Sequence, residues 1–468
     1  MGGVLGRAAD ESLLLTVVAL FVTFVAVTAA PYMLWGDSWL TFLGGREVAT
    51  HGIPGADTLA VLSRGREWID QQWLAQLASY ELESTLGLQA TLAVFAAMIA
   101  VPFVLACRYA RRDASPRSVA IFALLAAPAA LCAVRAQAFS YLLFVPFLAL
   151  LAAESRAPSR RVWLALPLLA LWANLHGAVL VGAALVSLLG LSELAARPRR
   201  GLALVLLPWP CVFASPYGLS LVGYYRSTAA NPLFKKYILE WAPPTFPTAI
   251  GLPFFLTAAA GLLLVARRPR DLTLFELGAL AFTLLGALTS ERSITWFSYA
   301  ALLFLPRVLE RAWPQAAPSP PLRRVLAACA AASVAVGATA SVAAAANASA
   351  RIRSVWPPAA VQAVRAALAA EGSADWLLYE IPELRGRIAF DGRFEILSRA
   401  QFQSVRDYLR QSGPGWERAG RRYRIVVVDP ARNRNLFRTY EARGLRVLYR
   451  GPRVAVFERR VFGSAHSS

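Results

Sequence analysis

Apolar segments of roughly 15 to 23 residues recur through the first 345 residues, and they constrain the fold of this chain more than any other feature. They lie at 12–34, 87–107, 118–134, 138–154, 162–176, 178–196, 202–216, 247–266, 272–289, 294–309 and 325–345. With 57% hydrophobic residues and a mean hydropathy of +0.48, the chain exceeds what one soluble core needs. We therefore expect an α-helical polytopic membrane protein with about 11 transmembrane helices.

The basic residues of the short loops predict the direction of these helices. Counted loop by loop, 18 Lys and Arg fall on the side of Arg7 and 8 fall on the opposite side. Because Lys and Arg are retained on the cytoplasmic side, we place the N-terminus inside and the C-terminal domain outside. The expected location is a bacterial plasma membrane, and the first segment is too long to be a removed signal peptide.

The composition divides the chain into two expected domains. Residues 1–345 form a transmembrane domain with a large first outer loop at 35–86, and residues 346–468 form a small α/β extracytoplasmic domain. The patterns in the second domain predict helices at 358–370 and 398–411 and strands at 376–381, 387–390, 424–429, 446–449 and 453–458. The four cysteines all lie in or beside apolar segments, so no disulfide framework is expected.

The second domain is also strongly basic, with 22 Arg against 11 Asp and Glu. One explanation is a general preference of this sequence for Arg, because the whole chain has almost no Lys. The other is a surface that binds anionic headgroups or a phosphate-bearing substrate. No nucleic-acid-binding motif surrounds these residues, so nucleic acid is not an expected partner.

The first outer loop combines aromatic residues with acids. Asp37 follows the first apolar segment directly, and residues 37–50 are amphipathic, which predicts a helix lying along the membrane surface. Residues 67–86 repeat that pattern. Trp residues at an interface are commonly anchors, but anchoring does not explain the acids that accompany Asp37, which are Asp57, Glu67, Asp70, Glu81 and Glu83.

These residues carry a family resemblance. The order is one span, the acid Asp37, a surface helix, a His51-Gly52 turn, a Gly65-Arg-Glu-Trp68 segment and a Trp-Leu helix. It resembles membrane glycosyltransferases of the GT-C superfamily, particularly bacterial proteins related to protein O-mannosyltransferases and aminoarabinose transferases. The chain has Ser38 where the family usually carries a second acid, and Asp70-Gln-Gln-Trp-Leu where the family carries a Lys-Pro-Pro-Leu-like element.

The resemblance implies a function for the candidate residues. Members of the family take a sugar from a polyprenyl phosphate on the outer face of the membrane, and Asp37 matches the acid that acts as general base or organises the acceptor. We include Asp70 among the candidate substrate-binding residues. Membrane lipids and a polyprenyl-phosphate-linked sugar donor are the expected partners, and the oligomeric state is left open.

Arg135 and Arg292 are the candidate cations for the donor phosphate. Glycosyl transfer from a phosphate needs a carboxylate to take the acceptor's proton and cations to hold the leaving phosphate. Arg135 lies with Gln137 in a short outer turn, and Arg292 lies beside Glu291 in another. Each Arg alone is explained equally well by snorkelling to the headgroups, but two such turns favour a shared phosphate site.

Two further outer segments contain candidate residues. Asn174 and His176 end the fifth apolar segment, where they either complete the helix end, hold a substrate hydroxyl or assist Asp37. The segment 214–246, which contains Tyr225 and Arg226, is either a helix over a lipid-phosphate pocket or a membrane anchor. Too few ligands can be brought together to predict a metal site, and a divalent metal is left open.

Four charged residues in other places have alternative explanations. In the C-terminal domain, Asp391, Arg393 and Glu395 follow a predicted strand, where Asp-Gly forms a turn or the side chains cover the pocket. Glu276 lies inside the ninth apolar segment, and we do not place it in the site.

We expect an integral-membrane glycosyltransferase that moves a sugar from a polyprenyl-phosphate donor to a lipid, glycan or protein acceptor. The alternative is a non-catalytic lipid-carrier binding protein or a transporter of envelope glycolipid precursors. A transporter is expected to show internal repeats and broken helices near the midplane. The sequence shows no such duplication.

Overall fold

A computed structural model shows the fold of the chain and describes residues 2–29, 33–229, 231–313, 319–367, 374–421 and 423–459. The chain forms two compact units. One, here called the helical unit, consists of Met1–Ala29 and Ala90–Ala345. The other, here called the mixed unit, consists of Ala30–Gln89 and Ala346–Ser468. Each unit is described by itself.

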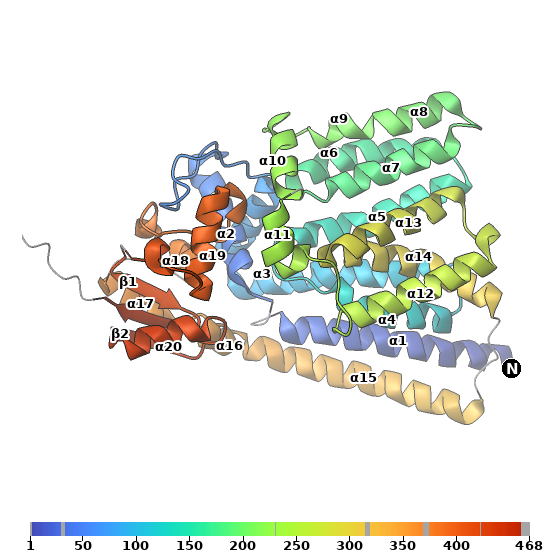
Figure 1. Ribbon diagram of the computed structural model, residues 1–468. Coiled ribbons are helices and arrows are strands. Elements are labelled where there is room, and N and C mark those ends of the chain that lie inside the picture. The colour runs from blue at the N-terminus through green and yellow to red at the C-terminus, as the bar shows by residue number, and fades with distance from the viewer. Residues whose placement is uncertain are drawn as a thin grey trace, which may run out of the picture. The chain divides into compact units, whose positions relative to one another are not determined.

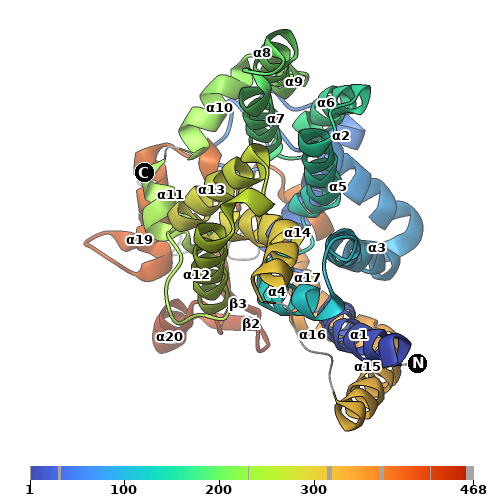
Figure 2. The ribbon, with the colours of Figure 1, turned by 90° about the vertical axis from the view of Figure 1, so that its right-hand side faces the viewer.

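The helical unit is a set of long helices that run alongside one another (Figure 1), and Figure 2 views them nearly along their axes. Its helices are α1 (Gly2–Thr28), the second part of α3 (Trp73–Ala110), α4 (Pro116–Ala130), α5 (Gln137–Arg156), α6 (Ala165–Leu175), α7 (Val179–Glu193), α8 (Pro198–Leu206), α9 (Pro208–Val212), α10 (Ser220–Ala229), α11 (Pro232–Tyr237), α12 (Gly251–Arg267), α13 (Leu274–Thr289), α14 (Ile294–Ala312) and α15 (Pro320–Ala346). Short 3₁₀ turns connect them, namely η1 (Arg160–Leu164), η2 (Leu239–Trp241), η3 (Pro269–Asp271) and η4 (Glu291–Ser293).

Every apolar segment of the sequence overlaps one or more of these helices, and residues 30–32 of the first segment lie outside the described residues. Within the described part of the chain, four helical segments are long and apolar enough to cross a membrane: Glu11–Thr28, Trp73–Ala110, Gln137–Arg156 and Pro321–Ala346. Four shorter helices are also apolar. The chain is thus a predominantly helical protein suited to membrane association, and the number of 11 crossings stays a prediction.

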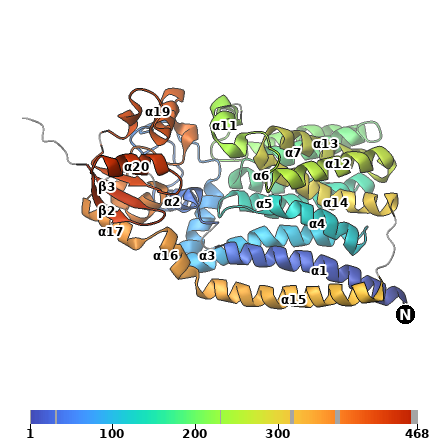
Figure 3. The ribbon, with the colours of Figure 1, turned by 60° about the horizontal axis from the view of Figure 1, so that its bottom comes forward.

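Close packing of small residues joins neighbouring helices of this unit. A side chain added at Gly190 of α7 would come within 2.6 Å of the Gly201 carbonyl oxygen of α8. Likewise, Gly337 of α15 lies against Thr23 of α1, and these two helices run side by side in Figures 1 and 3. Such contacts are typical of helices in lipid, where small residues let backbones approach each other.

Glu276 has a structural partner set that explains its burial. It lies at the third position of α13, where it forms a capping box with Thr273. Its carboxylate pairs with Arg156 at 2.7 Å and also with Arg307, both inside the helical unit. A fully buried carboxylate needs such partners, which supports leaving Glu276 outside the candidate site.

The mixed unit combines short helices with a small sheet (Figure 3). Its elements are α2 (Gly36–His51), the first part of α3, α16 (Ala348–Val355), α17 (Pro358–Ala367), α18 (Ala374–Glu380), η5 (Pro382–Leu384), η6 (Phe394–Ile396), α19 (Arg399–Arg410), η7 (Trp416–Ala419), β1 (Ile425–Val428), α20 (Arg434–Ala442), β2 (Arg446–Arg450) and β3 (Ala455–Glu458). The sheet is antiparallel in the order β1-β3-β2, with Val426 opposite Phe457.

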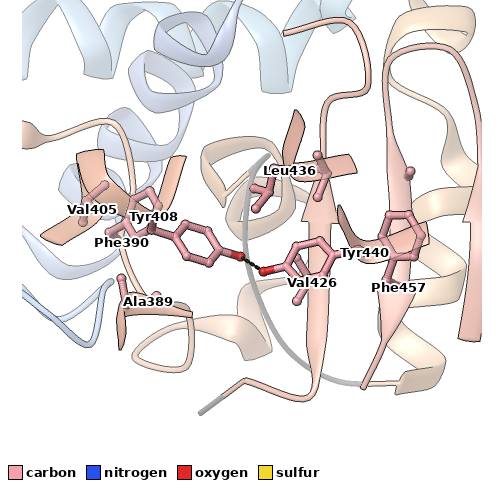
Figure 4. Close-up of a cluster of buried hydrophobic side chains, with 11 residues drawn as sticks. Ala389, Phe390, Val405, Tyr408, Val426, Leu436, Tyr440 and Phe457 are labelled. Atoms are coloured by element: carbon pink, nitrogen blue, oxygen red, sulfur yellow. Dashed lines mark hydrogen bonds between the residues drawn. The ribbon is translucent and has the colours of Figure 1, made fainter. Parts of the chain in front are cut away.

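Buried side chains from α19, α20 and the sheet form the core of the C-terminal segment (Figure 4). Tyr408 of α19 and Tyr440 of α20 are both buried, and their hydroxyl oxygens are 2.9 Å apart. Each buried hydroxyl therefore finds its hydrogen-bond partner in the other. Phe457 of β3 contacts the Tyr440 ring and completes this core.

The first loop packs with the C-terminal segment instead of forming a separate surface helix. Trp39 of α2 contacts the rings of Trp356 and Tyr379, and Arg46 donates to the carbonyl oxygens of Leu378 and Tyr379 at 2.7 and 2.6 Å. The expected surface helix at 37–50 is therefore buried along most of its length. This division differs from the sequence-based domains, because residues 35–86 join 346–468 in one unit.

Two of the predicted strands are wrong. Residues 376–381 lie mostly in helix α18, which packs on α2 and buries the three consecutive apolar residues Trp376, Leu377 and Leu378. Residues 387–390 form only an isolated bridge between Ile388 and Ala60. The other three predicted strands and both predicted helices form, although residues 368–370 lie outside the described residues.

Gly87 interrupts α3 with φ 79° and ψ 162°, a conformation that L-residues with a side chain rarely adopt. The amphipathic residues before it belong to the mixed unit, and the apolar residues from Ala90 on belong to the helical unit. The glycine thus marks where the chain passes from one unit to the other.

Because residues 30–89 and 346–468 form one unit, we expect both segments to lie on the same side of the membrane. In a variant with all four cysteines replaced by Ala, single cysteines at the exposed Glu67 and Ser412 should react alike with a membrane-impermeant thiol reagent added to intact cells. A cysteine at Arg199, on the predicted cytoplasmic side, should react only after lysis. Labelling of Glu67→Cys and Ser412→Cys from opposite sides would contradict the unit described here.

Candidate functional site

Arg135 and Glu240 form an ion pair in the helical unit. Arg135 lies between α4 and α5, and its Nη1 is 3.1 and 3.2 Å from the two carboxylate oxygens of Glu240 in η2. The side chains are 17% and 35% exposed, so solvent reaches both partners. The short turn that holds Arg135 therefore contacts the segment between α11 and α12, which is far from it in sequence.

Arg292 approaches the same place from η4, between α13 and α14. Its guanidinium carbon is 4.7 Å from the centre of the Trp241 ring, directly after Glu240 in sequence. Burial, followed by the charge of Arg135, lowers the pKa of Arg292, although a guanidinium remains charged at neutral pH. Arg135 and Arg292 thus lie close enough for their charges to oppose each other.

His176 lies just beyond the end of α6, where the charges of both arginines act on it. Burial lowers its pKa well below the usual value, and the charges of Arg292 and Arg135 add to this effect. Its Nδ1 is 3.2 Å from the backbone N–H of Ala178 and accepts a hydrogen bond from it. In the neutral ring the proton is then on Nε2, which can donate a hydrogen bond.

We call Arg135, His176, Glu240, Trp241 and Arg292 the arginine cage. It contains two cations with one paired carboxylate, a neutral imidazole and an aromatic ring. Such a set suits an oxyanion, because Arg presents several N–H donors in one plane and His176 adds another. The structure therefore brings together Arg135, His176 and Arg292, which the sequence predicted as site residues.

The other predicted residues of this unit make contacts of their own. Buried Gln137 donates from Nε2 to the Tyr141 hydroxyl at 3.0 Å, and Asn174 donates to the carbonyl oxygens of Ala170 and Ala214. The backbone N–H of Glu291 donates to the Ala242 carbonyl oxygen at 2.9 Å. The Tyr225 ring lies against the Tyr224 ring, with centroids 5.6 Å apart, and Arg226 is exposed.

Asp37 and Asp70 lie in the mixed unit, in a group that we call the carboxyl cluster. Its members are Asp37, Asp57, Asp70, Asp375, Asp391, Arg393 and Glu395. Asp37 is exposed in the first turn of α2. Asp375 is buried in the first turn of α18, and burial, the charge of Asp391 and the charge of Asp37 together raise its pKa well above the usual range.

Arg393 is the cation around which this cluster is built. It is 3% exposed, and its Nε is 3.0 and 3.1 Å from the carboxylate oxygens of Asp391. Its Nη2 is 2.7 Å from Asp57 of the first loop, and its guanidinium lies 4.3 Å above the Trp68 ring. A buried cation held this way fixes the Asp391-Gly-Arg393 turn to the first loop, which supports the structural explanation of that motif.

Asp70 is buried in the same cluster. Its Oδ1 accepts a hydrogen bond from Gln76 Nε2 at 2.9 Å, while its Oδ2 has no hydrogen-bond partner. Burial raises the pKa of Asp70 to about 7, against the opposing effect of the Arg393 charge. Asp70 therefore lies with Arg393 and Glu395 of the C-terminal segment, and at pH 7 about half of its carboxyl groups are protonated.

A cavity of about 410 Å³ opens beside α2 in the mixed unit. Its lining residues are Leu43, Arg46, Glu47, Thr50, His51, Leu59, Leu378, Pro382 and Arg385. Glu47 pairs with Arg385 at 2.8 Å and with His51 at 3.3 Å. Arg46, the second guanidinium at this cavity, donates to the backbone carbonyl oxygens of Leu378 and Tyr379.

No three Asp, Glu, His or Cys side chains in the described part of the chain are arranged to hold a metal ion. A divalent metal stays an open prediction. Glu240 and Asp375 are the residues that the sequence did not single out. Glu240 appeared only within a mixed aromatic and cationic segment, and nothing local distinguished Asp375 from other helix-start acids.

Comparison with known proteins gives no family assignment. No protein-family model matches the chain, and no curated protein matches it. Any function therefore has to be argued from the arginine cage and the carboxyl cluster.

We expect the Asp70→Asn variant to be more stable than the wild type at pH 8 and equal to it near pH 4. The folded pKa of about 7 lies above the usual 3.8, so protonation favours the folded chain, and this stabilisation is lost as pH rises from about 4 to 7. The neutral amide of the Asn variant does not lose this stabilisation, so its free energy of unfolding at pH 8 should exceed that of the wild type by about 1–3 kcal/mol. Thermal unfolding of the full chain in detergent at both pH values measures the difference.

Glu67→Gln is the matched control, because Glu67 is an exposed acid of the same loop. It should change stability little at either pH. A gain for Asp70→Asn that does not depend on pH would contradict the assignment of a raised pKa.

Proposed function

We propose that this protein is an integral-membrane glycosyltransferase. In this proposal it moves a sugar from a polyprenyl-phosphate donor to a lipid, glycan or protein acceptor on the outer face of the plasma membrane. The observation that carries the proposal is the arginine cage, where Arg135 and Arg292 come together with His176 at connections between apolar helices.

The charge of the cage supports a lipid phosphate as its ligand. Two guanidinium groups oppose each other there, and only Arg135 has a carboxylate partner among the described residues. Because nearby positive charges destabilise each other, an anion between them lowers the energy of the site. A phosphate that loses its sugar gains negative charge during the reaction, so the same cations also stabilise the transition state.

In this proposal Asp37 accepts the proton of the acceptor hydroxyl. The bond from the sugar's anomeric carbon to the phosphate oxygen breaks, with its electron pair leaving on the phosphate. A new bond forms between that carbon and the acceptor oxygen, whose proton passes to the Asp37 carboxylate. The exposure of Asp37 supports this role, since a general base has to reach the acceptor.

The experiment is transfer of label from radiolabelled polyprenyl-phosphate sugars to a crude envelope extract by the full chain in lipid nanodiscs. Binding of the donor is measured in the same preparation. Transfer establishes an enzyme, whereas donor binding without transfer indicates the non-catalytic carrier or a transporter. Absence of both transfer and binding would contradict the proposal.

We expect Asp37→Asn to bind the donor as the wild type does and to lose transfer by about 10²- to 10⁴-fold, because only proton transfer is removed. Loss of donor binding in Asp37→Asn would contradict its role as the base. The measurement is the initial rate of transfer at saturating donor.

We expect Arg292→Gln to lose both donor affinity and transfer, with a fall of about 10²- to 10³-fold in kcat/KM. Arg199→Gln is the matched control, because Arg199 is an exposed arginine of the same unit. An equal loss in both variants would indicate a general charge effect instead of a phosphate site.

A further inference from the structure

We propose that Glu240 sets the charge of the arginine cage so that it selects a lipid-linked phosphodiester over a lipid-linked diphosphate. This inference rests on the proposed function and names the substrate class of the same site. A sugar linked through one phosphate carries one negative charge at that phosphate, and a sugar linked through a diphosphate carries two.

The position of Glu240 is fixed by several contacts. Its carbonyl oxygen accepts a hydrogen bond from Ser290 Oγ at 2.9 Å, and the Glu291 N–H donates to the Ala242 carbonyl oxygen at 2.9 Å. These bonds hold η2 against the segment that contains Arg292. The Glu240 carboxylate is therefore held beside Arg135 by backbone contacts as well as by the ion pair itself.

Arg292 is the cation that Glu240 does not pair with. Within the described residues, no carboxylate lies within ion-pair distance of Arg292, and its guanidinium instead lies over Trp241. His176 adds no charge, because its imidazole is neutral. With Glu240 bound to Arg135, the cage retains one uncompensated positive charge.

That single charge matches the phosphodiester. A diphosphate would leave one negative charge uncompensated unless it displaced Glu240 from Arg135, and displacement would leave a partly buried carboxylate without its partner. Like charges in a partly desolvated site repel strongly, so Glu240 discriminates by repulsion. Discrimination against the wrong ligand commonly uses such a repulsive group.

The negative charge of Glu240 also acts on the product of the reaction. After transfer, the lipid monophosphate has a second acidic proton with a pKa near 6, so it carries close to two charges at pH 7. Glu240 then repels the product more than the donor. Retention of the sugar-bearing donor and release of the sugar-free lipid phosphate follow from one carboxylate.

The test compares lipid binding by the full chain in nanodiscs of neutral lipid. Two ligands that share one polyprenyl chain and one sugar are used, one linked through a phosphate and one through a diphosphate. The wild type should prefer the monophosphate-linked lipid. Glu240→Gln should raise the affinity for the diphosphate-linked lipid by roughly tenfold. It should raise the affinity for the monophosphate-linked lipid by less than about threefold.

Glu11→Gln is the matched control, because Glu11 is an exposed acid of the helical unit that pairs with Arg111 and belongs to no candidate site. The control variant should leave the preference for the monophosphate-linked lipid unchanged. Glu240→Asp, which keeps the carboxylate, should retain part of that preference where Glu240→Gln loses it. An unchanged preference in a folded Glu240→Gln variant that still binds the donor would overturn this inference. Failure of the wild type to bind either lipid would instead remove the proposed function.

Discussion

The separation of charge from lipid is the constraint on which the rest of this structure depends. A bilayer cannot solvate backbone amides, so the apolar segments form helices, and charged side chains are left to the helix ends. At one set of connections this leaves Arg135, Glu240 and Arg292 close together. At another, Glu276 pairs with Arg156 and Arg307. In the first group Arg292 has no carboxylate partner among the described residues, whereas in the second both arginines pair with Glu276, which is why only the first is treated as a site.

Much of the helical unit could be predicted from the sequence, because long apolar runs are a direct physical signal. The same signal placed Arg135, His176 and Arg292 in connections between helices. It could not identify Glu240, since the pairing of η2 with the turn before α5 depends on contacts between distant segments.

The mixed unit was harder to predict for a related reason. Residues 376–381 have the composition of a strand, but burial against α2 selects a helix. The amphipathic pattern of residues 37–50 gives the helix correctly and does not say whether protein or lipid covers its apolar side. The protein cover over this helix comes from the C-terminal segment, which Arg393 joins to the first loop through its ion pair with Asp57, 336 residues away.

This distance along the chain has a consequence for synthesis. The first loop leaves the ribosome long before residues 346–468, yet Trp39, Phe42 and Trp68 become buried only in the completed unit. During the intervening synthesis of the helical segments, these aromatic side chains have no final partners. The loop therefore has to be kept from aggregation or proteolysis until the last quarter of the chain arrives. Shortened chains that end before residue 346 would keep that exposed surface permanently and become natural targets for cellular quality control.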